Sequence, residues 1–95
     1  MALIPGRTEI LVSGRPRRLM QSSATMPTRH LIVMPLDGNT GNIWIGGENT
    51  RAVAGSEAGM MLRAKHWIRL DGCDLAEVWV DSTVDGDGVA WLAIT

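Results

Sequence analysis

Apolar and polar side chains alternate in short runs along this chain, and glycine or proline interrupts the runs every few residues. Neighbouring side chains of a β-strand point to opposite faces, so this alternation predicts strands. The clearest run spans residues 28–34, where Leu31 and Val33 share one face. Ile32 and Met34 share the other face, which therefore also carries apolar side chains.

A second run, residues 43–45, follows a loop rich in glycine and asparagine and stops at a double glycine. These two flanks are turn signals, so the run between them predicts a short strand. Ile43 and Ile45 alternate with Trp44, which puts bulky apolar groups on both faces. In a chain of 95 residues, another subunit could cover the second face.

The same reasoning predicts further extended segments at residues 8–12, 15–22, 50–54, 66–70, 77–81 and 89–94. Residues 56–66 are rich in Ala, Glu, Met, Leu and Lys, so a helix competes there. Two flanking glycines and the short spacing between turns favour extended structure around residues 60–62 instead.

Turn chemistry suggests how these segments connect. Residues 15–22 are predicted to return beside 8–12 as a hairpin, with Pro16 at a sheet edge because proline cannot donate to a ladder. The sequence Asp-Gly-Asp-Gly at residues 85–88 is typical of a hairpin turn between the last two strands. Asp74 predicts the N-cap of a single helical turn.

Seven to eight short strands at this spacing predict an all-β fold, either a small antiparallel β-sandwich of jelly-roll-like type or a barrel. Residues 1–6 are expected to form an N-terminal arm, and residues 7–95 a single β-sandwich domain. A hydrophobic content of 45% is too high for a disordered chain.

Charge is distributed unevenly along the chain. Residues 1–36 carry five arginines and one glutamate, a net charge of 5 − 1 = +4, and residues 37–95 carry 4 − 9 = −5. A molecule divided in this way suits salt-sensitive contacts with partners. The alternative is that the strands mix these charges in space.

Cys73 is the single cysteine, so no intrachain disulfide can form, which is typical of a protein made in a reducing compartment. The N-terminal Met-Ala-Leu-Ile is interrupted by Pro5-Gly6, and we expect no signal peptide. No apolar run is long enough to predict a membrane span, and no membrane partner is expected.

Catalysis has little support in the residue pattern. His30 and His66 each lie in a predicted strand, and neither belongs to a recognisable arrangement with a nucleophile and an acid. Both are expected to be packed or half-exposed side chains, and no enzymatic activity or cofactor is expected.

The acidic run Asp81, Asp85 and Asp87 invites comparison with calcium-binding loops. The EF-hand loop also requires a distal bidentate glutamate, whereas this chain continues into a strand. A hairpin turn is the favoured interpretation, and no metal site is predicted.

Arg15, Arg17 and Arg18 raise the local positive potential and could contact nucleic acid phosphates. No aromatic residue is interleaved with them, and a charged edge strand that avoids aggregation explains them equally well. Contact with an acidic patch of a neighbouring subunit is a third interpretation. We favour the edge strand and expect no nucleic acid partner.

Tryptophans are the most distinctive side chains, at positions 44, 67, 79 and 91. An exposed tryptophan could stack on a sugar ring, although packing in the core is commoner. Trp67 and Trp79 alternate with aliphatic residues that claim the inner face. These two are therefore predicted to lie on an outer surface that another subunit covers.

Three segments taken together resemble a group of small virion proteins of tailed bacteriophages. They are Gly41-Asn-Ile-Trp-Ile-Gly-Gly47, Asp74-Leu-Ala-Glu-Val-Trp-Val-Asp81 and Asp85-Gly-Asp-Gly-Val-Ala-Trp-Leu92. The resemblance extends from about Leu36 to Ile94, and this chain has tryptophan where tyrosine is commoner in the group.

The resemblance implies a non-enzymatic capsid decoration (cement) protein, a homotrimer that binds the major capsid protein on the capsid exterior after synthesis in the bacterial cytoplasm. A head-fibre, neck or tail component is the alternative within the virion, and a carbohydrate-binding module is the alternative outside it. The candidate subunit or capsid contacts are Leu3, Ile4, Arg15, Arg17, Arg18, Trp44, Trp67 and Trp79.

Overall fold

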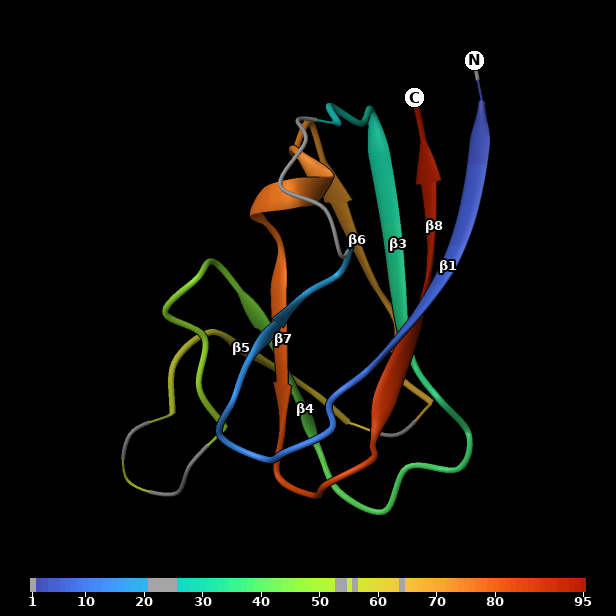
Figure 1. Ribbon diagram of the computed structural model, residues 1–95. Helices are drawn as coiled ribbons and strands as arrows, with labels where there is room; N and C mark the ends of the chain where they lie inside the picture. The colour runs from blue at the N-terminus through green and yellow to red at the C-terminus, as the bar shows by residue number, and fades with distance from the viewer. Residues whose placement is uncertain (1, 21–25, 53–54, 56, 64) are drawn as a thin grey trace.

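The computed structural model describes residues 2–20, 26–52, 55, 57–63 and 65–95. Within these residues the chain forms two four-stranded antiparallel sheets and one turn of 3-10 helix, η1 (Leu75–Glu77) (Figure 1). The all-β prediction is confirmed, and the arrangement resembles a sandwich. The barrel alternative was wrong, because the described strands form two separate sheets.

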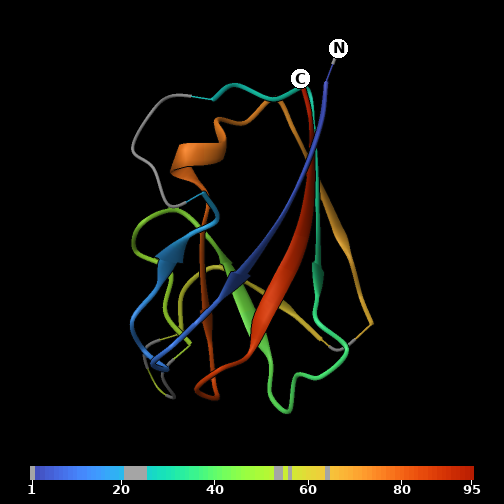
Figure 2. The same ribbon diagram turned by 45° about the vertical axis from the view of Figure 1, so that its right-hand side comes forward.

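The two sheets form two layers (Figure 2). Sheet A has the order β1 (Leu3–Glu9), β8 (Gly88–Ile94), β3 (His30–Pro35) and β6 (Ile68–Asp71). Sheet B has the order β2 (Arg17–Arg18), β7 (Trp79–Ser82), β4 (Ile43–Gly46) and β5 (Met60–Leu62).

The core lies between the sheets and is built by the predicted alternation. Leu31 and Val33 of β3 are fully buried, and so are Ile43 of β4 and Val80 of β7. They belong to one cluster of buried apolar side chains from both layers. The strands at residues 28–34 and 43–45 are therefore confirmed, and their aliphatic residues stabilise the fold by burial.

The N-terminal arm was wrong, because β1 begins at Leu3 and pairs with β8 along its whole length. Ile4 packs against the core cluster. Gly6 lies against the ring of Trp91, and a Cβ atom at this position would overlap that ring. The chain termini consequently lie side by side at one end of sheet A (Figure 1).

Both predicted hairpins were wrong. Strand β1 belongs to sheet A and β2 to sheet B, and the turn at residues 85–88 carries the chain from β7 in sheet B to β8 in sheet A. The backbone of that turn bonds to Ile10, with Gly86 N donating to Ile10 O at 2.7 Å. Asp-Gly pairs indicate a tight turn, but the choice of sheet depends on distant partners.

Predictions that depend on a few neighbouring residues are confirmed at two places. Asp74 is the N-cap of η1 and accepts from the backbone N–H of Ala76 at 2.9 Å. Extended structure around residues 60–62 is confirmed by β5, although residues 56 and 64 lie outside the described part. Of the predicted strand at 50–54, the described residues contribute an isolated bridge, and residues 53–54 lie outside the description.

Candidate interaction surfaces

The outer face of sheet A carries a row of apolar side chains from β1, β8 and β3. Residues opposite each other in paired strands point to the same face of a sheet. Because Ile32 and Met34 point outward, their partners in β8 and the partners of those residues in β1 also point outward. The apolar members of this face are Leu3, Ile32, Met34, Leu92 and Ile94. Trp67 immediately precedes β6, and the register of β3 with β6, continued by one residue, places it beside Met34.

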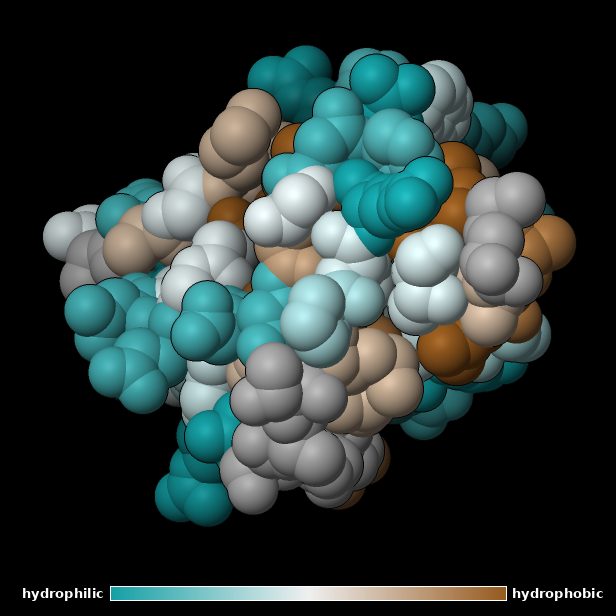
Figure 3. Space-filling view, turned by 90° about the horizontal axis from the view of Figure 1, so that it is seen from above, coloured by the Kyte–Doolittle hydropathy of each residue, from teal (hydrophilic) through white to brown (hydrophobic). Residues whose placement is uncertain are grey.

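These side chains remain accessible to solvent. Leu3 is 63% exposed, Met34 42% and Trp67 62%. Viewed from above, hydrophobic side chains gather on the side of the molecule where β1, β3 and β8 lie in Figure 1 (Figure 3). Exposed apolar faces are common at protein interaction sites, so this face is a candidate interaction surface.

Charged residues border this face on both flanks. On β1, Arg7 Nη2 lies 2.8 Å from Glu9 Oε1. On β6, Arg69 Nε lies 3.2 Å from Asp71 Oδ1, and His30 Nδ1 lies 2.7 Å from the same oxygen. The hydrogen bond with His30, helped by the charge of Arg69, holds the pKa of Asp71 below its ordinary value of 3.8.

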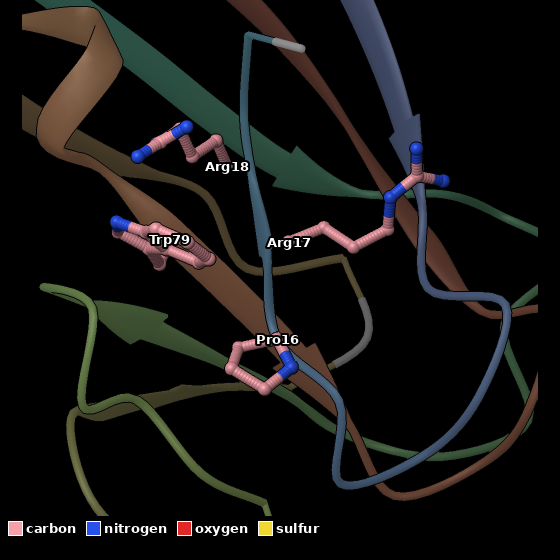
Figure 4. A pocket seen from close by; sticks show the side chains of 4 residues that line it. All are labelled: Pro16, Arg17, Arg18 and Trp79. Atoms are coloured by element: carbon pink, nitrogen blue, oxygen red, sulfur yellow. The ribbon is translucent and has the colours of Figure 1, made fainter. Parts of the chain in front are cut away.

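The outer face of sheet B is organised around Trp79. Its indole is half-buried beneath Arg18, whose Cζ lies 4.9 Å from the ring centroid, within cation–π distance. Two hollows meet at this pair. Pro16 and Arg17 also line the smaller one, of about 220 Å³ (Figure 4), and the other has a volume of about 440 Å³. Glu48 and Glu77 contribute to the larger hollow.

The three arginines predicted as one basic cluster point in different directions. Arg17 extends toward β1, where its Nη1 donates to the carbonyl of Glu9 at 3.0 Å, whereas Arg18 covers Trp79 (Figure 4). Arg15 is exposed and lines a separate hollow of about 230 Å³ with Leu11. The three guanidinium groups therefore do not converge on one point, although Arg17 lines one hollow with Arg18 and another with Arg15.

Asp81 belongs to the acidic run that was compared with calcium-binding loops. Its carboxylate accepts hydrogen bonds from backbone N–H groups. Its side chain points to the outer face of sheet B opposite Trp44, yet it is fully buried. Its carboxylate accepts from the backbone N–H groups of Gly14 at 3.0 Å, Ala52 at 2.8 Å and Ser82 at 2.9 Å. Two loops are thereby fastened over the middle of sheet B.

The other two acids of the run also accept backbone hydrogen bonds. Asp87 accepts from Thr40 and Gly41 N–H, the latter at 2.8 Å. Asp85 accepts from Ser13 N–H at 2.7 Å. Among the described residues, no three His, Cys, Asp or Glu side chains are grouped so as to hold a metal ion. The run thus ties three loops to the end of the sandwich where β7 crosses to β8.

The eight predicted contact residues fall into four groups. Leu3 and Trp67 belong to the outer face of sheet A, whereas Ile4 points inward. Trp44 and Trp79 share the outer face of sheet B with Arg18. The remaining two, Arg15 and Arg17, lie along the β2 edge.

Sequence reasoning missed the central members of the sheet A face, namely Ile32, Met34, Leu92 and Ile94. The signal was present, because both of the strands concerned carry apolar residues on both faces. Only the pairing of β3 with β8 shows that these residues form one surface.

Comparisons of the chain with known protein families, curated proteins and solved structures find no significant match. In the described part of the chain, no helix has both the length and the apolar character needed to cross a membrane.

Proposed function

We propose that this chain is a structural protein of a tailed-bacteriophage particle, a capsid decoration protein that binds the major capsid protein on the outside of the shell as a homotrimer. The observation that carries the proposal is the exposed apolar outer face of sheet A, which suits an assembly protein. The three segments that resemble small virion proteins are the reason for proposing a phage particle as the assembly.

We propose further that the sandwich is a jelly roll. The pairs β1·β8, β2·β7, β3·β6 and β4·β5 are those of one long hairpin, and wrapping that hairpin brings β3 beside β8 and β4 beside β7. Jelly rolls occur in viral capsid and lectin domains, so this topology supports the proposal by analogy of fold.

A decoration protein acts by mass action. If it binds the expanded capsid lattice more tightly than the unexpanded one, each bound copy stabilises the expanded form. In this proposal the β2 edge, with Arg15, Arg18 and Trp79, contacts the major capsid protein. Residues 3–6 are part of β1 and do not serve as a separate binding arm.

Quantitative mass spectrometry of purified particles tests the proposal. A copy number comparable to that of the major capsid protein is expected for decoration of the whole lattice. A number that fits one ring or a few fibres would move the chain to the neck, the tail or a head fibre. Absence from the particle would reject the virion role.

Sugar binding is the second candidate, because Trp79 lies beside Glu48 and Glu77 in the larger hollow. An aromatic face with adjacent hydrogen-bonding groups is a common way to hold a saccharide. A glycan screen monitored by tryptophan fluorescence tests it. Specific quenching in the wild type that Trp79→Ala abolishes would favour this function over decoration.

A further inference from the structure

We infer that the outer face of sheet A is the surface through which copies of this chain associate with one another. This deepens the proposed function, on which it rests, because it assigns the self-contact to one face and leaves the Trp79 surface for a different partner. The partner that covers Met34 and Trp67 is thus a second copy.

The composition of the face matches a protein interface with an apolar centre and a polar rim. Ile32, Met34 and Leu92 occupy the two central strands, β3 and β8. Charged side chains stand on the flanking strands β1 and β6. Association would therefore bury aliphatic groups in the middle and leave the ion pairs at the solvated margin.

The charges of the rim favour a second copy over a strongly charged partner. The β1 flank carries Arg7 and Glu9, and the β6 flank carries Arg69 and Asp71, so the four sum to 2 − 2 = 0. Each flank holds one charge of each sign. In a homotrimer each copy contacts two neighbours, and a face with both signs on each flank can meet either neighbour with opposite charges opposed, whereas a partner of one sign gains no net attraction.

Edge-to-edge association is discouraged at the β1 edge of sheet A and at both edges of sheet B. Pro5 lies in the edge strand β1 and cannot donate a ladder hydrogen bond, and Arg7 and Glu9 add charge to the same edge. On sheet B the edge strands β2 and β5 have two and three residues. Association of copies through a sheet face is therefore favoured over extension of a sheet.

The area of the face is sufficient. The 24 residues of the four strands, rising about 3.3 Å each in strands spaced about 4.8 Å apart, give a footprint of roughly 380 Å². The relief of the side chains increases the accessible area above this projection. Two copies together would then bury about 1,000 Å², which is the lower bound for a specific interface.

A pair of matched substitutions tests the inference. Met34→Glu places a carboxylate at the centre of the sheet A face, and Met60→Glu makes the same change at a 62% exposed methionine of sheet B. Sedimentation velocity and light scattering of the purified protein measure association. We expect an oligomeric wild type, an association constant at least roughly 100-fold weaker in Met34→Glu, and no change in Met60→Glu.

A monomeric wild type would overturn the inference, and so would a Met34→Glu protein that stays as associated as the wild type. Equal dissociation of both variants would also reject it, because the effect would then not depend on the face. Circular dichroism and urea unfolding confirm that both variants are folded. Copy number in the particle tests the virion role separately, so either idea can fail alone.

Discussion

The outer faces of the two sheets differ in what covers them. On sheet B the chain covers its own strand, because loops at Gly14 and Ala52 bond to Asp81 and bury it completely. On sheet A the corresponding face keeps Leu3 and Met34 exposed. A sandwich this small buries only part of its apolar surface, so apolar side chains of an outer face can stay exposed to solvent.

The difference has a chemical origin. Sheet B receives carboxylates that accept backbone N–H groups, and a charged acceptor makes a strong hydrogen bond in a buried place. Sheet A receives aliphatic side chains, which bind any apolar partner without directional demands. The loops bonded to Asp81 therefore serve internal stability, whereas the aliphatic face of sheet A stays accessible to a partner.

Asp81→Ala should have the largest effect, because it removes the acceptor that fastens two loops over the outer face of sheet B. Three backbone N–H groups lose their acceptor in a buried site, and we expect the free energy of unfolding to fall by about 3–4 kcal/mol. Asp85→Ala is the control, since Asp85 is exposed and accepts from one N–H group, so a loss of about 1 kcal/mol or less is expected. Urea denaturation measures both, and equal losses would contradict this account.

Gly6→Ala tests whether residues 3–6 belong to sheet A. A Cβ atom there overlaps the Trp91 ring, so we expect destabilisation of about 2–3 kcal/mol from overpacking. Gly47→Ala is the matched control, because a Cβ atom at Gly47 meets no atom within 4 Å. A neutral Gly6→Ala in thermal unfolding would mean that this segment is not packed against Trp91.

Trp67→Ala and Trp79→Ala sharpen the comparison between the faces. We expect Trp67→Ala to weaken self-association about tenfold with less than 0.5 kcal/mol change in stability, since Trp67 is mostly exposed. Trp79→Ala should leave self-association intact and weaken capsid binding. Analytical ultracentrifugation and co-sedimentation with capsids separate these outcomes. If both variants stay assembled but melt early, the two tryptophans support the fold instead.

The smallest effect is expected at the rim. His30→Ala should raise the pKa of Asp71 toward 3.8, because the hydrogen bond that lowers it is lost. Since the folded-state pKa lies below the unfolded value, the stability from this pair is complete above pH 3.8 and is lost as pH falls through the folded pKa. Carboxyl titration by NMR measures the shift. An unchanged Asp71 titration would remove His30 as its cause.

Local order could be read from the residues themselves. Leu31, Val33, Ile43 and Ile45 follow the period of a strand and are buried as that period predicts. Asp74 caps η1 because a side-chain oxygen two residues from a free N–H group needs no distant partner.

The candidate surfaces were predictable in part. The sequence shows that residues 28–34 and 89–94 carry apolar side chains on both faces. These segments supply most of the outer face of sheet A, but the sequence does not show that they pair. Trp67 and Trp79 were placed on outer surfaces, but nothing in their spacing assigned them to different sheets. That assignment follows from the pairing of β6 with β3 and of β7 with β4.

The sequence by itself determined the positions of most strands, though not of β1, and which of their side chains are apolar, because alternation, turn residues and caps act over a few positions. Tertiary structure decided which sheet each strand joins. It also directs the side chains of Arg17 and Arg18 to different elements and buries Asp81. The acceptors and donors concerned are far apart in sequence, as in the bond of Gly14 to Asp81 across 67 positions. Such contacts form only when the two sheets close on each other.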